Sequence, residues 1–301
     1  MNSTENASRL AEEIRSSGAK KVLLQLPEGM KFNAAEIISE LKKSGIDAAV
    51  SGGATYGACD IKDSEAKRLG CDLLVHVGHN KFYKDFETEV PVLYFPWTID
   101  IDADNIDFSQ IKEKRIGLIT SVQHVGSLKN LKSLLEKNGK DAVVGGQILG
   151  CSCAASDKID DRVDAFLFAG TGDFHSLALK TDKPIYVYDI EKNSVEELDK
   201  SQFEKRMYAN IFRARDAKTF AVLVSTKKGQ NNLTGNADTV VEYLKRKDKK
   251  AFIIVMDYVT DSDLRGLKVD AFINTACPRL MDDSWSKPFI NANDIEKIFE
   301  E

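Results

Sequence analysis

The sequence predicts an α/β fold built by triplication, in which three similar doubly wound domains with parallel sheets surround a central site. Apolar segments alternate with amphipathic ones, and a basic stretch before an apolar run recurs at Lys20, Lys114 and Lys218. The apolar runs lack strict alternation, which is typical of strands buried on both faces. A repeat of about 100 residues indicates domains rather than a solenoid, whose units are shorter. The expected domains are residues 1–110, 111–212 and 213–301.

Each third of the chain contains four apolar runs that predict strands, with one amphipathic segment after the first run. The first-strand segments are 20–29, 114–124 and 218–229, and the second-strand segments are 46–53, 141–150 and 251–259. The third-strand segments are 71–79, 163–172 and 269–277, and the fourth are 90–97, 183–190 and 287–294.

The segments 32–45, 125–140 and 236–250 predict helices, because apolar residues recur at three- and four-residue spacing and basic residues gather near their ends. Gly45 and Gly139 are expected to end two of them. The amphipathic N-terminus predicts a further helix. The charged segment 189–218 is expected to be helical and to bridge the second and third domains.

Composition limits the possible partners and the compartment. The net charge of −5 argues against non-specific nucleic-acid binding. No apolar stretch is long enough to span a bilayer, and the first residues lack the apolar core of a signal peptide. We therefore expect a cytoplasmic protein with reduced thiols. Five cysteines, an odd number, suit metal ligation better than a disulfide framework.

Three cysteines follow predicted strands, one in each third of the chain. Cys59 and Cys151 come after the second strand of their domains, and Cys277 comes after the third, so all belong to carboxyl edges where such folds bind ligands. Thiolates are soft ligands for iron and zinc. A 4Fe-4S cluster normally takes four cysteines, so three would leave one iron open for a substrate.

The other two cysteines have less specific interpretations. A single free cysteine is more often a small buried hydrophobe, and we expect this of Cys71. Cys153 forms a CSC pair with Cys151, which suits a redox dithiol, two metal ligands, or one ligand and a bystander.

Histidines and glycines also lie at predicted strand ends. His79 and His175 are candidates because loops carry function disproportionately, whereas His76 falls inside a strand and is expected in the core. The fourth histidine, His124, begins a loop, and no histidine-based zinc motif is present. The amides of GTGDFHSL, residues 170–177, suit a carboxylate or phosphate. The turn LPEG and the segment STKKGQNNL are either further parts of a site or ordinary loops.

The motifs TYGACD, LGCDLLVHVGHN, QILGC, GTGDFHSLAL, KKGQ and NTACPRL, in this order over almost the whole chain, resemble the archaeal diphthamide synthase family. The resemblance implies three α/β domains that each give one cysteine to a single 4Fe-4S cluster. The ligands would be Cys59 of YGAC, Cys151 of ILGC and Cys277 of TACPR. Many relatives carry a second cysteine directly after the first ligand, where this chain has Asp60.

The resemblance also implies the first step of diphthamide formation. A radical made from S-adenosylmethionine at the cluster transfers the 3-amino-3-carboxypropyl group to a histidine of translation elongation factor 2. The expected S-adenosylmethionine contacts are Glu28, Gly29, Tyr56, Gly170, Thr171, Gly172, His175 and Gln230. His79 and His175 are the catalytic candidates beside the cluster, and His79 and Tyr56 are expected to line the path of the incoming histidine.

Archaeal members are homodimers that take an electron from an external donor, which the sequence does not identify. Two alternatives remain at this stage. A quinolinate-synthase-like 4Fe-4S dehydratase has a similar plan, although YGAC and TACPR argue against it. The other is a non-enzymatic small-molecule-binding protein with core cysteines.

Overall fold

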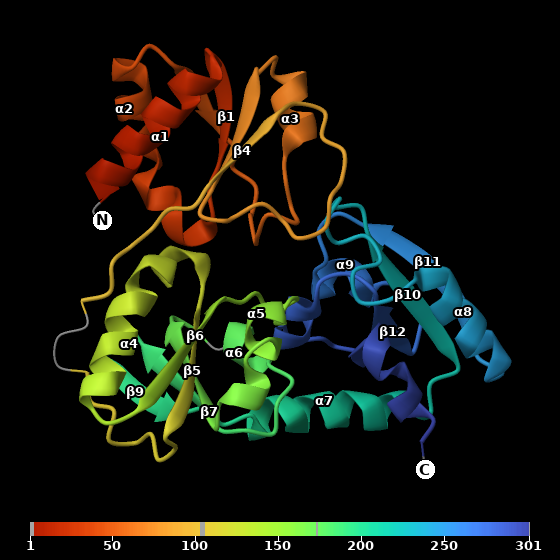
Figure 1. Cartoon of the computed structure of the whole chain (residues 1–301). Helices are drawn as coiled ribbons and strands as arrows, with labels where there is room; N and C mark the ends of the chain where they lie inside the picture. Colours follow the sequence, from red (N-terminus) through yellow and green to blue (C-terminus); the bar gives the residue numbers. More distant parts are fainter. Residues whose placement is uncertain (1–2, 103–105, 173, 301) are drawn as a thin grey trace. The chain divides into compact units, whose positions relative to one another are not determined.

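The computed structural model describes residues 3–102, 106–172 and 174–300. Three mostly parallel sheets with flanking helices follow one another along the chain (Figure 1). The chain divides into two compact units, residues 1–198 and 199–301, which we call unit 1 and unit 2. Unit 1 contains the first two sheets and unit 2 the third. The domain boundaries predicted at 110/111 and 212/213 stay a prediction.

The first sheet has the strand order β2-β1-β3-β4, with every pair parallel. Helices α1 (Ser3–Ser17) and α2 (Ala34–Lys43) pack on one face, and α3 (Asp63–Arg68) packs on the other. Successive side chains of β1 point to opposite faces of the sheet. Val22 and Leu24 pack in the cluster with α1, and Leu23 packs in the cluster with α3. The predicted burial on both faces is confirmed. The strands are β1 (Lys21–Gln25), β2 (Asp47–Val50), β3 (Leu73–Val77) and β4 (Val92–Phe95).

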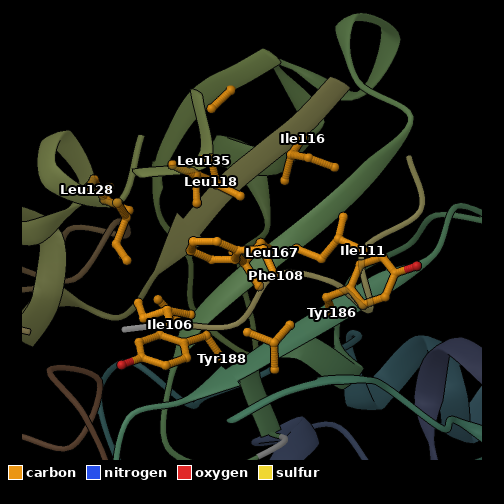
Figure 2. Close-up of a cluster of buried hydrophobic side chains, with 14 of the residues drawn as sticks. Ile106, Phe108, Ile111, Ile116, Leu118, Leu128, Leu135, Leu167, Tyr186 and Tyr188 are labelled. Atoms are coloured by element: carbon orange, nitrogen blue, oxygen red, sulfur yellow. The ribbon is translucent and has the colours of Figure 1, made fainter. Parts of the chain in front are cut away.

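The second sheet repeats this order as β6-β5-β7-β8 and adds β9 at the edge. Helix α4 (Leu128–Lys137) covers one face through the buried cluster drawn in Figure 2. The short helices α5 (Ala154–Asp157) and α6 (Phe174–Leu177) follow β6 and β7. The strands are β5 (Arg115–Thr120), β6 (Asp141–Gln147), β7 (Ala165–Gly170), β8 (Ile185–Asp189) and β9 (Ser194–Glu197).

Strand β9 corrects the expectation that residues 189–218 are helical throughout. It runs antiparallel to β8, with Val195 opposite Tyr188 and buried. Asn193 has a φ of 51° and Asp189 accepts hydrogen bonds from the next turn, so a tight reversal forms. One buried valine, preceded by a serine and followed by two glutamates, gave no clear strand pattern. The helical expectation holds only for α7 (Ser201–Ala214).

The third sheet has the order β11-β10-β12-β13 and is parallel throughout. Helices α7 and α8 (Ala237–Arg246) pack on one face, and α9 (Asp261–Arg265) lies on the other. The strands are β10 (Thr219–Ser225), β11 (Lys250–Met256), β12 (Ala271–Asn274) and β13 (Phe289–Asn291). Short 3-10 turns complete the fold at Glu28–Asn33, Val122–Ser127, Asp160–Arg162, Pro278–Asp282 and Ala292–Ile298.

Glycines follow two of the helices, as predicted. Gly45 and Gly139 follow α2 and α4 with φ angles of +74° and +77°, which confirms them as helix stops. Within the described residues, no helix is long and apolar enough to cross a membrane.

Candidate metal centre

The three candidate cysteines lie in loops that follow strands, as predicted. Cys59 is buried in the loop between β2 and α3. Cys151 lies at the tip of a turn after β6, where the backbones of Leu149 and Ser152 exchange hydrogen bonds of 2.9 and 3.0 Å. Cys277 is half-buried directly after β12, in unit 2.

A buried amide at the end of β1 holds the Cys59 loop. The side chain of Gln25 is fully buried, and its Nε2 donates to Thr55 Oγ1 (3.2 Å) and to the carbonyl of Asp60. Its Oε1 accepts from the backbone N–H of Lys62 (3.1 Å). Removing these partners would leave buried polar groups unsatisfied, so the loop is strongly specified. Gln25 therefore sets the position of Cys59 from both sides.

A chain of histidines extends this network. His76 in β3 is fully buried, with Nδ1 3.1 Å from Gln25 Oε1 and Nε2 3.0 Å from His79 Nδ1. Because Gln25 Oε1 is an acceptor, the His76 proton belongs on Nδ1, and its Nε2 accepts from His79 Nδ1–H. The expectation of a hydrogen-bonded core histidine at 76 is confirmed. Neutral His79 then keeps Nε2 as an acceptor.

His79 and His175 form a desolvated pair. Burial lowers the pKa of His79 to about 4, with a smaller contribution from the nearby His175. Burial likewise lowers the pKa of His175 to about 4. The Nδ1 atom of His175 is buried with no hydrogen-bond partner in the described part of the chain. Native proteins rarely leave such an atom unsatisfied, so a water or a bound molecule is expected to pair with it.

The histidine pair predicts a specific pH dependence of stability. Both folded-state pKa values lie below the unfolded value of about 6.5, so the unfolded chain binds more protons between pH 6.5 and 4. The stability that the neutral rings contribute is complete above pH 6.5 and is lost as the pH falls toward 4. We expect a loss of about 2–3 kcal/mol per histidine, measurable by urea unfolding of iron-free protein. A His79→Gln, His175→Gln variant should show a shallower slope, and an unchanged slope would contradict the assignment.

Two contacts pack the Cys151 turn against its neighbours, α6 and Tyr83. Gly150 precedes Cys151, and a Cβ atom there would collide with the ring of Phe174, the neighbour of His175 in α6. Close approach of α6 therefore requires glycine at this position. On the other side of the turn, the Tyr83 hydroxyl lies 3.4 Å from the Cys151 carbonyl oxygen.

The electrostatics of Cys151 suit a cationic ligand. Burial and then the proximity of Cys59 raise the pKa of the Cys151 thiol to about 11, and a hydrogen bond from Tyr83 opposes this. A thiolate at Cys151 would be repelled by a second one at Cys59, so Cys151 loses its proton readily only when a metal neutralises the charge. The thiol donor set therefore fits an iron–sulfur group.

The remaining cysteines of unit 1 have structural surroundings. The Cys153 thiol donates to the carbonyl of Ala178 at an S–O distance of 3.3 Å, at the start of α5. Cys71 is buried in an apolar cluster with Leu23 and Leu74, and burial raises the pKa of its thiol. The expectation that Cys71 is a core residue is confirmed, and the choice of Cys151 over Cys153 as a ligand stays a prediction.

In unit 2 an asparagine performs the task that Gln25 performs in unit 1. Asn274 ends β12, and its Oδ1 accepts from the Ala276 N–H (2.9 Å). Its Nδ2 donates to the Cys277 carbonyl (2.9 Å) and to Asn291 Oδ1 (2.8 Å). The Cys277 loop is thus held from the sheet. Gln25 and Asn274 were not among the predicted site residues, although each is a polar residue at the end of an apolar run.

The other predicted site residues lie at the expected edges. Glu28 is exposed and pairs with Lys31 (2.6 Å), whose ammonium also donates to the carbonyls of Gly52 and Gly53. Gly170 is the last residue of β7, and Gly29 lies in the 3-10 turn after β1. The rest occupy strand-end loops: Tyr56, Thr171 and Gly172 in unit 1 and Gln230 in unit 2.

Two groups of predicted residues come together in unit 1. Cys59 lies near Cys151, and His79 lies near His175. In the described ranges, no three His, Cys, Asp or Glu side chains form a group that could hold a metal ion. Cys277 and Gln230 are described with unit 2 alone.

Comparison with known proteins agrees with this reading. The family model for diphthamide synthesis proteins matches residues 26–301. The chain is 35% identical to the 2-(3-amino-3-carboxypropyl)histidine synthase of Pyrococcus horikoshii, over 96% of this chain and 88% of that protein. It is 33% identical to subunit 1 of the Schizosaccharomyces pombe synthase, over 92% of this chain and 68% of the relative.

Two solved structures share the fold. The crystal structure of Dph2 from Pyrococcus horikoshii has a TM-score of 0.86 and 34% identity, and covers 98% of this chain and 91% of its own. The structure of that protein with a 4Fe-4S cluster has a TM-score of 0.85 and 34% identity, and covers 97% and 90%. The triplicated α/β fold is therefore confirmed, and an iron–sulfur cofactor is supported.

These similarities also decide between an enzyme and a binding protein. Relatives that match nearly the whole chain are named as 2-(3-amino-3-carboxypropyl)histidine synthases, which is a transferase activity, so the chain is an enzyme of this class. The non-enzymatic alternative is thereby excluded. With a matching family model over residues 26–301 and relatives above 30% identity, the chain belongs to the diphthamide synthesis protein family.

Proposed function

We propose that this enzyme transfers the 3-amino-3-carboxypropyl group of S-adenosylmethionine to a histidine of translation elongation factor 2. The reaction would be the first step of diphthamide biosynthesis, carried out in the cytoplasm. The observation that carries the proposal is the pair Cys59 and Cys151, which lie near one another in strand-end loops of a fold whose neighbour was solved with a 4Fe-4S cluster.

The residues that would hold the cluster are Cys59, Cys151 and Cys277. When bound, the cluster would supply one electron and an open iron position, which together break the sulfonium on its methionine-chain side to give a radical. The chain's part is to keep the three thiols at defined positions. Gln25 fixes the Cys59 loop, the Leu149–Ser152 turn fixes Cys151, and Asn274 fixes Cys277.

His175 and His79 would serve the methionine end of S-adenosylmethionine. Both rings are neutral at pH 7, so they do not repel the sulfonium or the ammonium group. The unpartnered Nδ1 of His175 can accept from an ammonium or donate to a carboxylate, depending on its tautomer. The Gly170–Gly172 turn offers backbone amides beside it, and Gly172 has a φ of +71°.

Other strand-end residues would bound the binding space. Glu28, Gly29, Thr171 and Gln230 are proposed contacts to S-adenosylmethionine, and Tyr56 would line the path of the incoming histidine. Tyr56 is 45% exposed, so its ring can meet a macromolecular substrate. The partners are thus the elongation factor, a second copy of this chain and an external electron donor.

The chemistry predicts a specific product. Anaerobic enzyme with reconstituted iron, dithionite and S-adenosylmethionine should yield methylthioadenosine, identified by chromatography and mass spectrometry. Release of deoxyadenosine instead would contradict the proposal, because it requires breakage of a different carbon–sulfur bond. Omission of dithionite is the matched control. Addition of elongation factor 2 should place the 3-amino-3-carboxypropyl group on one histidine, located by peptide mass spectrometry.

A further inference from the structure

Strand β11 is an apolar strand at an open sheet edge. It lies at the end of the third sheet (Figure 1), and residues 251–256 (AFIIVM) carry no charge. Phe252, Ile253 and Val255 are 44%, 38% and 63% exposed. Proteins normally protect such an edge with charges, a bulge or a covering segment, because free N–H and C=O groups recruit another strand. An unprotected edge of this length therefore indicates a partner.

The hydrogen bonds within the sheet show which residues of β11 face outward. The N–H of Lys250 donates to the Lys218 carbonyl (2.9 Å), and the carbonyl of Met256 accepts from the Thr226 N–H (3.0 Å). In a parallel ladder alternate residues bond to the same neighbour, so the even-numbered residues of β11 bond to β10. Ala251, Ile253 and Val255 then direct their backbone groups to the open edge.

We propose that the occupant is β11 of a second copy of this chain, paired antiparallel about a two-fold axis at Ile253. This register pairs each outward-facing residue with another. Ile253 meets Ile253 of the partner subunit, and Ala251 meets Val255 of the partner subunit. The two sheets would join into one continuous sheet. The inference deepens the homodimer part of the proposed function by naming its surface.

Charge complementarity selects this occupant and this register. The segment before the strand, residues 245–250 (KRKDKK), is strongly basic, and the segment after it, residues 257–263 (DYVTDSD), is acidic. Antiparallel pairing of identical strands places the basic end of each strand beside the acidic end of the other. The dimer therefore contains two such contacts, related by the two-fold axis. With the axis at Ile253, Lys249 faces Asp257 of the partner subunit. An axis at Ile254 would instead place Lys249 opposite Val259 of the partner subunit.

A single cysteine variant tests the register. A hydrogen-bonded antiparallel pair has Cα atoms about 5.5 Å apart, which suits a disulfide. Ile253→Cys should therefore form a covalent dimer under mild oxidation, seen on non-reducing gels. The matched control is Val255→Cys, whose two copies would lie about 13 Å apart along the strands. Wild type, with its own cysteines, sets the background. Equal cross-linking at 253 and 255, or none at 253, would overturn the proposal.

A charge swap tests the partner. Lys249→Glu and Asp257→Lys should each raise the dimer dissociation constant about tenfold, because each creates two like-charge contacts. The double variant restores opposite charges and should regain the wild-type constant, measured by analytical ultracentrifugation. Failure of that rescue would contradict the pairing.

The proposed interface and the proposed reaction can be rejected independently of one another. Methylthioadenosine formation by a wild type that sediments as a monomer would reject the interface and leave the reaction standing. A cross-linked dimer without that product would reject the reaction alone. Protection of β11 from hydrogen exchange only after elongation factor 2 is added would assign the edge to the protein substrate and overturn the proposal.

Discussion

Replacing Cys59, Cys151 or Cys277 by alanine is expected to remove the iron–sulfur cluster and to lower methylthioadenosine formation by at least about a hundredfold. Loss of outer-sphere groups alone costs about 10–100-fold in metal sites, and loss of a ligand should exceed that. A cluster held by three cysteines, where four are usual, has no ligand that it can lose without exposing a second iron. Iron and sulfide analysis with electron paramagnetic resonance, under anaerobic conditions, measures the cluster directly.

Cys153→Ala provides the matched control for Cys151→Ala. The two residues share one short turn region, but the Cys153 thiol donates to the Ala178 carbonyl, whereas the Cys151 thiol lies near Cys59. Cys153→Ala should keep the cluster and cost only about 1 kcal/mol of stability for a lost hydrogen bond. Loss of the paramagnetic signal in Cys153→Ala with its retention in Cys151→Ala would reverse the assignment.

The sheets could be predicted because their physics is local. A strand buried on both faces must be apolar at nearly every position, and Ala165–Gly170 shows this without exception. Strand β9 has no such signal, because only Val195 of its four residues is buried. Its pairing depends on the chain reversal at Asn193. Contacts with the rest of the fold, and not the local sequence, decide whether the chain turns there or continues as a helix.

The sequence predicted which loops carry the site residues, but it did not predict the contacts that hold those residues in place. Carboxyl strand ends share one edge of a sheet, so the cysteines and histidines could be placed there from sequence. The bonds of Gln25 reach residues 30 to 51 positions away, and neither hydropathy nor spacing encodes such partners. The same holds for the orphaned Nδ1 of His175, which depends on the packing around α6.

The second large effect concerns Lys62, which supports the Cys59 loop from within. Its ammonium lies 2.9 Å from Asp60 Oδ1, and the two side chains are only 9% and 1% exposed. Lys62→Met would leave the Asp60 carboxylate buried beside Cys59 without this cation. Removing one partner of a buried ion pair typically costs about 3–5 kcal/mol, because the remaining charge has lost its compensation. We therefore expect a lower urea midpoint for Lys62→Met in iron-free protein, and faster hydrogen exchange across residues 55–62.

Two variants separate this effect from a general loss of lysine. Lys67→Met removes the partner of Glu89 in an exposed pair at 3.3 Å, and should cost less than about 1 kcal/mol. The double variant Asp60→Asn, Lys62→Met removes both charges and should recover most of the loss, because neither charge of this pair remains. Equal small effects at Lys62 and Lys67 would mean that water reaches the Asp60 carboxylate. Iron incorporation by Lys62→Met should then match wild type.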